Sequence, residues 1–224
     1  MVRNSPSGSQ LTAPPNSLAS LVKTMTWPKG QVIHRIHLDL YAPAAFNPGL
    51  RGNARFSPIT DGNGAAIPTL YGGTSFDCAA METVFHDVPF APGLKTFDKA
   101  KLQGQVHSLL APERDLILAD LSAIALRSLG VQRKQLIDTE KDHYPQTRLW
   151  AEAIHAACPQ IDGLCWISRQ DDRASALVLF GNRIGAAELI SSGSPRSLLG
   201  EQDLYDDVLT LAERIGVNLI SSRR

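Results

Sequence analysis

Residues 69–87 read TLYGGTSFDCAAMETVFHD, and this stretch predicts a short strand that passes almost directly into a helix. The strand-forming residues end at the pair Gly72-Gly73. Ser75 follows, and serine is a residue type that commonly caps the N-terminus of a helix. Beyond it, apolar residues recur four positions apart, so we expect a helix over about 76–87.

Two side chains in this stretch have unusual settings. Glu82 lies among apolar helix residues such as Ala79 and Phe85, and a carboxylate on a buried face is costly unless it is paired or used. A plainer interpretation places Glu82 at the edge of that face, reaching water. Tyr71 ends the strand just before the glycines, where its ring is either exposed at the end of the sheet or packed in the core.

Glu82 and His86 are four residues apart, so they would share one face of a continuous helix. A protein metal site needs three or four converging ligands. No third ligand suggests itself in the sequence. We therefore interpret the two residues as a solvated or hydrogen-bonded pair and predict no metal site.

Outward from this stretch, short strands alternate with helices. Apolar runs and alternating patterns predict strands at 31–40, 105–110, 115–119, 163–167 and 176–180. Caps and helical periodicity predict helices at 17–22, 120–130, 145–157 and 203–215. The buried stripe expected for the third of these helices consists of Leu149, Trp150, Ala153, Ile154 and Ala157.

The fold class expected from this pattern is α+β in a single domain, because strands outnumber helices and several are close enough in sequence to form hairpins. Residues 1–24 are expected to be a flexible tail with a short helix, residues 25–190 the main body, and residues 191–224 a helical segment packed on the same domain. Residues 43–68 contain proline, glycine and asparagine throughout, which predicts a long irregular stretch of the kind that is often functional.

Composition narrows the class of protein. The 224 residues include 22 Lys+Arg and 22 Asp+Glu, and a balanced charge gives no general attraction to nucleic acid or to an anionic membrane. The three cysteines form no CxxC pair, which argues against a disulfide framework and a structural zinc site. No signal peptide or membrane-spanning run is recognisable. We therefore expect a cytoplasmic protein with no membrane partner.

The common catalytic signatures are absent from the sequence, which has no phosphate-binding P-loop, dinucleotide fingerprint, HExxH or GxSxG motif. Two arginines nevertheless have notable positions. Arg35 lies within a predicted strand between apolar neighbours, and Arg55 lies in the irregular stretch. A guanidinium group suits bidentate binding of phosphate, although a surface ion pair is the ordinary role of an arginine.

Taken together, these segments resemble the RES domain family, the toxins of bacterial RES–Xre toxin–antitoxin pairs. The likeness covers about residues 31–184, and its most specific block is 71–87. The matching pieces are VIHRI (32–36), FNPG (46–49), RF (55–56), TLY (69–71), AAMETVFHD (79–87), DGLCWISR (162–169) and LVLF (177–180).

The family is named for an arginine, a glutamate and a serine, which we match to Arg55, Glu82 and Ser168. Family members usually carry glycine-rich sequence close before this arginine. Here that region is GLRGNARF (49–56), so Arg51 competes for the role. We prefer Arg55 because Phe56-Ser57-Pro58 follows it.

The resemblance implies a fold similar to ADP-ribosyltransferases, with a split β-sheet core surrounded by helices and NAD+ bound in a cleft. It also implies that NAD+ is degraded as a substrate, by water or by inorganic phosphate, with no other cofactor. The implied partner is an Xre-like helix-turn-helix antitoxin that blocks the cleft, rather than DNA itself. The sequence is also compatible with a homodimer.

On this resemblance, each matched residue has an expected role. Cleavage of the nicotinamide–ribose bond develops positive charge on the ribose, and the Glu82 carboxylate would stabilise it. Arg35 and Arg55 would hold the pyrophosphate, and the Tyr71 ring would stack on nicotinamide or ribose. The Ser168 hydroxyl would orient either Glu82 or the substrate.

Two other functions remain open from the sequence. An ADP-ribosyltransferase would use the same site to modify a protein. A catalytically silent module would keep the fold and bind only a nucleotide or a partner, although the presence of all four matched residues, Arg55, Tyr71, Glu82 and Ser168, argues against loss of activity.

Overall fold

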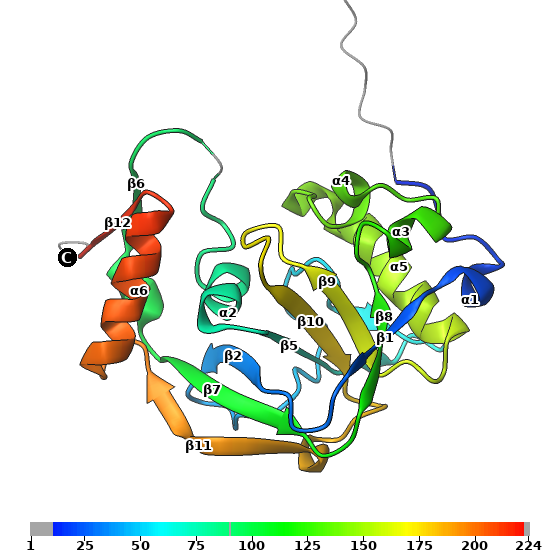
Figure 1. The fold of residues 1–224 in the computed structure, drawn as a ribbon, viewed down its shortest axis with the longest axis horizontal. Helices are drawn as coiled ribbons and strands as arrows, with labels where there is room; N and C mark the ends of the chain where they lie inside the picture. Colours follow the sequence, from blue (N-terminus) through cyan, green and yellow to red (C-terminus); the bar gives the residue numbers. More distant parts are fainter. Residues whose placement is uncertain (1–10, 90, 222–224) are drawn as a thin grey trace, which may run out of the picture.

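The computed structural model describes residues 11–89 and 91–221, which fold around one strongly curled sheet of eight strands (Figure 1). The strand order is β1-β8-β9-β10-β5-β2-β7-β11. The strands are β1 (Thr24–Trp27), β2 (Ile33–Leu38), β5 (Thr69–Gly73), β7 (Gln105–Pro112), β8 (Leu116–Asp120), β9 (Gly163–Ile167), β10 (Ser175–Phe180) and β11 (Leu189–Ser197). Neighbouring strands are antiparallel except for β8 and β9, which are parallel. The α+β prediction is confirmed.

The sheet is almost divided between β5 and β2. These two strands share a single paired position, His34 with Gly73, whereas β2 and β7 are paired over the whole of β2. Glycine lets the strands approach at this point, because a Cβ atom on Gly72 would lie 2.3 Å from Cγ2 of Ile33. Beyond the shared position β2 and β5 separate, so side chains between them are free to line a cleft.

Six α-helices and two small sheets complete the part of the chain that the structure describes. The helices are α1 (Leu18–Leu21), α2 (Phe76–Thr83), α3 (Ala125–Ser128), α4 (Arg133–Leu136), α5 (Tyr144–Ala157) and α6 (Gln202–Arg214). The small sheets pair β3 (Ile59–Thr60) with β4 (Ala66–Ile67), and β6 (Lys95–Asp98) with β12 (Val217–Ile220). Short 3₁₀ turns cover Lys99–Leu102, Lys141–His143 and Ala186–Glu188.

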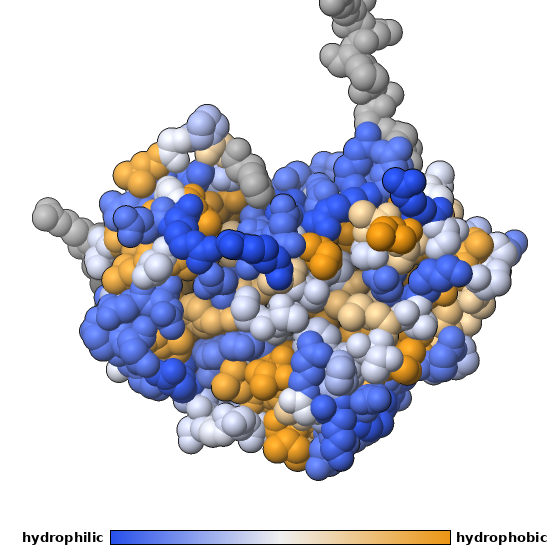
Figure 2. All heavy atoms as spheres, in the orientation of Figure 1, coloured by the Kyte–Doolittle hydropathy of each residue, from blue (hydrophilic) through white to orange (hydrophobic). Residues whose placement is uncertain are grey.

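The helices form two groups on either side of α2 (Figure 1). In one group, α5 packs on β9 and β10 through a cluster that includes Trp150, Ile154 and Trp166. In the other, α6 and the β6–β12 pair pack on α2 through Phe85, Leu204 and Val208. A third cluster, with Leu118, Leu177 and Leu179, is formed largely by residues of the sheet strands. The outline of the molecule is notched between the two groups (Figure 2).

Several predicted boundaries need correction. The helix expected over 76–87 ends at Thr83, and the strand expected over 31–40 is Ile33–Leu38. The helix expected over 120–130 is shortened to α3. Leu149, assigned to the buried stripe of α5, is 55% exposed, whereas Thr147 and Ala151 are buried. The side of α5 that faces the core is therefore rotated from the predicted one.

The terminal segments also differ from their predictions. Residues 191–224, expected to be helical, begin inside the edge strand β11 and end with α6 and β12. At the other end, α1 confirms the short helix expected over 17–22. The first ten residues of the predicted flexible tail lie outside the described residues. Within the described residues, no helix is long and apolar enough to cross a membrane.

Candidate active site

A cleft of about 360 Å³ opens where β2 and β5 separate, between α2 and the N-terminal end of α5. Four of the five candidate residues line it: Arg35 from β2, Arg55 from the irregular stretch, Tyr71 from β5 and Glu82 from α2. The fifth, Ser168, lies just beneath the cleft at the end of β9 and is fully buried. The fold thus gathers residues that are more than 130 positions apart in the sequence, from Arg35 to Ser168.

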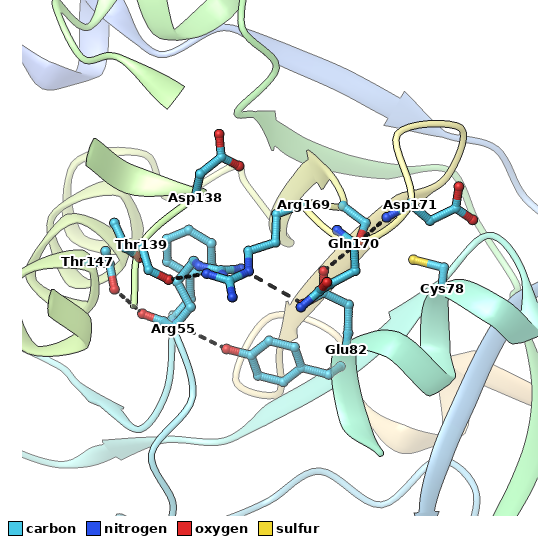
Figure 3. Close-up of polar contacts among 12 residues, drawn as sticks. Arg55, Cys78, Glu82, Asp138, Thr139, Thr147, Arg169, Gln170 and Asp171 are labelled. Carbon is cyan, nitrogen blue, oxygen red and sulfur yellow. Dashed lines mark hydrogen bonds and ion pairs between the residues drawn. The ribbon is translucent and has the colours of Figure 1, made fainter. Parts of the chain in front are cut away.

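Glu82 lies in the last turn of α2, whose first turn is capped by the Ser75 hydroxyl, as predicted. Its side chain is only 13% exposed. The Ser168 hydroxyl donates a hydrogen bond of 2.8 Å to Oε1 of Glu82. Nη1 of Arg55 lies 3.8 Å from the other carboxylate oxygen, Oε2. The carboxylate is therefore paired at both oxygens, as a buried charge requires, and still faces the cleft (Figure 3).

Ser168 is itself held by the loop between β9 and β10. The backbone N–H groups of Gln170 and Asp171 donate to its Oγ at 3.1 and 3.3 Å. These two donors occupy the acceptor positions of the hydroxyl, so its single proton is directed to Glu82. Of the two partners expected for the Ser168 hydroxyl, the structure shows the contact with Glu82.

Arg55 is 5% exposed although it lies on an irregular segment. Its guanidinium lies over the ring of Tyr144, with Cζ 5.6 Å from the ring centroid. Among the described residues, Nε of Arg55 has no hydrogen-bond partner. Arg55 is nevertheless one of the residues that line the cleft, where a buried guanidinium is suited to bind an anionic oxygen of a ligand.

Tyr71 lines the cleft, but its hydroxyl is already engaged. It accepts a hydrogen bond of 3.0 Å from the backbone N–H of Phe56, next to Arg55. Burial raises the pKa of Tyr71 to about 12, partly offset by hydrogen bonds from Ser57 and Phe56. The phenol is therefore neutral at physiological pH, and its contact with Phe56 ties β5 to the segment that carries Arg55.

Arg35 is 9% exposed on β2, and its Nη1 donates to the carbonyl oxygen of Pro43. Burial lowers the pKa of Arg35 to about 10, which still leaves it positively charged at neutral pH. The cleft therefore holds two buried cationic groups, Arg35 and Arg55, with the single carboxylate of Glu82.

Arg51 also lines the cleft, but it is exposed. Arg55, by contrast, is buried and faces Glu82. The two arginines that compete in the sequence therefore occupy different positions, Arg51 at the rim and Arg55 at the base.

Two cleft residues were not singled out from the sequence. Arg169 follows Ser168, and its Nη1 donates to the carbonyl oxygen of Thr139 at 2.7 Å (Figure 3). Tyr144 precedes the Pro145 that marks the start of α5, and its ring supports Arg55. In the sequence, the matched Ser168 drew attention to the neighbourhood of Arg169, and Pro145 to that of Tyr144. Neither residue indicates that the side chain of its neighbour lines the cleft.

The helical spacing expected between Glu82 and His86 is not observed. Because α2 ends at Thr83, His86 lies beyond the helix, and its Nδ1 is 2.7 Å from the Thr83 carbonyl oxygen. The described residues contain no group of three or more histidine, cysteine, aspartate or glutamate side chains arranged to hold a metal ion.

A thiol nucleophile is also disfavoured at this site. Cys78 lies one turn before Glu82 on α2 and is fully buried. Burial and the nearby Glu82 carboxylate raise the pKa of this thiol far above its usual range. Since the thiolate is the reactive form, Glu82 remains the group in the cleft with the charge to act on a developing cation.

This chain and its architecture are similar to known proteins in two respects. The family model of the RES domain matches residues 32–198. No curated protein matches the chain. Among solved structures, a chain of the M. tuberculosis MbcT–MbcA toxin–antitoxin complex is similar, with a TM-score of 0.57 and 13% sequence identity. The similarity covers 84% of this chain and 93% of that one.

The family match spans the strand with Arg35, the irregular stretch with Arg55, and the elements that carry Tyr71, Glu82 and Ser168. The structural likeness, which covers most of the chain, confirms the fold. The chain belongs to the RES domain family.

Proposed function

We propose that this protein is the toxin of a toxin–antitoxin pair and that it degrades NAD+ by cleaving the nicotinamide–ribose bond. The observation that carries the proposal is the carboxylate of Glu82, fixed by Ser168 and faced by Arg55 at the base of a cleft. The family membership supports the toxin role, as does the similarity to a chain from a toxin–antitoxin complex.

In the proposed reaction, the bond between the ribose C1′ and the nicotinamide nitrogen breaks, and its electron pair leaves with nicotinamide. Because the ring is cationic in NAD+, it departs as a neutral molecule and needs no proton from the protein. Positive charge then develops on the ribose. Glu82 stabilises this charge, and its fixed position means that little reorganisation is needed in the transition state.

An oxygen of water or of inorganic phosphate then forms the new bond to C1′. Water would release a proton and yield ADP-ribose, whereas phosphate would yield the phosphorylated ADP-ribose. Both acceptors would approach through the same open side of the cleft. The reaction consumes NAD+ as a substrate and uses no additional cofactor.

Binding of the dinucleotide is assigned to the groups around Glu82. Arg35 and Arg55 supply positive charge for the pyrophosphate from the lining of the cleft. The ring of Tyr71, whose hydroxyl is occupied by the backbone of Phe56, offers a face for nicotinamide or ribose.

We further propose an Xre-like helix-turn-helix antitoxin that covers the cleft. Such a partner would contact residues at the mouth of the cleft, such as the exposed Arg51. Its effect would be to keep NAD+ from Glu82.

Incubation of the purified protein with NAD+, with and without inorganic phosphate, tests the activity. Loss of NAD+ with release of nicotinamide is expected, and the second product identifies the acceptor. Mass spectrometry separates the alternative: an added ADP-ribose on a protein from a cell extract would indicate transfer instead. Unchanged NAD+ under all these conditions would contradict the proposed activity.

A further inference from the structure

Thr147 is a fully buried polar residue in the first half of α5, outside the set of residues that line the cleft. A threonine in a helix commonly satisfies its hydroxyl on the carbonyl three or four residues earlier. Thr147 makes such a contact with Tyr144, at 3.1 Å. The one proton of this hydroxyl is shared with a second acceptor outside the helix, the carbonyl oxygen of Arg55, which is the nearer of the two. It thus joins the two residues whose side chains stack at the base of the cleft.

Arg55 depends on such anchors because it belongs to no helix and no named strand. A tight turn from Ala54 to Ser57, closed by a backbone hydrogen bond of 3.0 Å, carries it. Phe56 in this turn is buried against Trp166, with ring centroids 5.0 Å apart. These contacts fix the turn, but only the Thr147 hydroxyl holds the backbone of Arg55 itself among the hydrogen bonds of the described residues.

We infer that Thr147 is a positioning residue for Arg55, an inference that rests on the proposed function of the cleft. The α5 hydroxyl fixes the Arg55 backbone while the Tyr144 ring, one helical turn earlier, supports its guanidinium. Together they keep Nη1 near Glu82, while Nε stays buried without a hydrogen-bond partner among the described residues. Thr147 itself touches neither substrate nor Glu82.

Two substitutions of Thr147 distinguish the contribution of its hydroxyl from the contribution of its side-chain shape. Thr147→Val keeps the branched shape and removes the donor, so NAD+ turnover should fall roughly tenfold in kcat/KM, because small displacements of a binding group are expensive. Thr147→Ser keeps the donor and should remain within about twofold of wild type. If both variants lost activity equally, side-chain packing rather than the hydroxyl would be responsible, and the inference would fail.

A matched control tests whether the loss of any side-chain hydrogen bond to α5 would lower kcat/KM as Thr147→Val does. Thr60 also donates a hydroxyl hydrogen bond to α5, at 3.0 Å to Glu152, but it does not line the cleft. Thr60→Val should leave kcat/KM near the wild-type value.

A double mutant tests whether Thr147 acts through Arg55. Thr147→Val combined with Arg55→Ala should have a kcat/KM no lower than that of Arg55→Ala alone, because the effects of residues that act through one another are not additive. Fully additive losses would contradict the inference.

A readout without catalysis keeps the inference distinct from the proposed function. In protein labelled with ¹⁵N-arginine, the Nε–H resonance of Arg55, assigned by its loss in Arg55→Ala, should shift or broaden in Thr147→Val and stay in place in Thr147→Ser and Thr60→Val. An unchanged resonance in Thr147→Val would overturn the inference even if NAD+ is consumed. If the wild-type protein leaves NAD+ intact but the resonance still shifts in Thr147→Val, only the proposed activity is contradicted.

Discussion

The charge on Glu82 is the property on which the proposed chemistry depends. Glutamine has the same shape and can still accept the hydrogen bond from Ser168, so Glu82→Gln should fold normally. It removes the negative charge that stabilises the ribose, and we expect NAD+ turnover to fall at least ~100-fold, the effect of losing one preorganised electrostatic group. Nicotinamide release and thermal unfolding should be measured on the same preparation.

Glu213→Gln is a suitable control for this change. Glu213 is an exposed carboxylate on α6, far from the lining of the cleft, and its substitution should change neither turnover nor melting temperature. Near-normal NAD+ loss in Glu82→Gln, with the control also active, would remove Glu82 from the mechanism.

Substitutions of Arg55 and Arg51 should affect the KM for NAD+ differently, because Arg55 is buried and Arg51 is exposed. Arg55→Ala should raise KM for NAD+ more than it lowers kcat if the guanidinium mainly binds phosphate in the ground state. Arg51→Ala, at the rim, should have a much smaller effect on KM. Steady-state kinetics of both variants decide the assignment, and the opposite order of effects would give the phosphate-binding role to Arg51.

Strand β9 shows how closely the backbones pack beneath the site. A Cβ atom on Gly163 would lie 2.2 Å from the carbonyl oxygen of Val178 in β10, where neither strand backbone has room to yield. Gly163→Ala should therefore destabilise the protein by roughly 1–3 kcal/mol or more, the usual cost of overpacking. For a chain of this size we expect the melting temperature to fall by about 2–4 °C for each kcal/mol.

Gly62 provides the matched control, since nothing lies within 4 Å of a Cβ atom at that position. Gly62→Ala should leave the melting temperature almost unchanged in calorimetry. Equal melting temperatures for the two variants would mean that β9 and β10 can separate without cost, contrary to the packing described.

Elements with a strong local sequence pattern were predicted well, and elements with a weak pattern were predicted poorly. The apolar run of β9 was predicted with its observed bounds, and Pro145 marked the start of α5. By contrast, the edge strand β11 reads LISSGSPRS and is exposed over most of its length, so it carries no apolar alternation to recognise. Its pairing with β7 comes from tertiary context, which overrides local preference in strands.

The candidate site followed from the sequence only in part. Resemblance to the family selected Arg55, Glu82 and Ser168, and the structure brings these three together. No pattern in the sequence could show that Thr147 contacts Arg55, because the contact joins a helix to an irregular loop 92 residues away. The same applies to Arg169, whose direction depends on the position of Thr139.

The near-division of the sheet connects the fold with the cleft. β2 belongs to the half with β7 and β11, and β5 to the half with β10, and the two halves meet at one paired position. Arg35 therefore comes from one half, and Tyr71 from the other. A continuous pairing of β2 with β5 would bring their backbones within hydrogen-bonding distance and close the space in which Glu82 faces the two arginines.

Histidines at this junction, of which His37 and His107 are buried and His34 is half-buried, should make the stability of the fold sensitive to acid. Nδ1 of His34 and Nε2 of His107 are 3.1 Å apart, a contact that needs at least one unprotonated ring. Burial lowers the pKa of His34, and burial, with smaller contributions from His34, Arg196 and His37, lowers that of His107 to about 4. Burial also lowers the pKa of His37. In the unfolded chain these groups titrate near their ordinary value of about 6.5.

At a pH between the lowered pKa of a histidine in the folded protein and its ordinary pKa of about 6.5, the unfolded state binds more protons than the folded state. The free energy of unfolding should therefore be highest above about pH 6.5 and decrease towards about pH 5. The slope is about 1.4 kcal/mol per pH unit for each additional proton bound on unfolding. Urea unfolding at pH 7.5, 6.5, 5.5 and 5 measures it, and His107→Gln should reduce the slope even if it lowers stability at every pH. A stability that is constant over this range would show that these histidines remain accessible to protons in the folded protein.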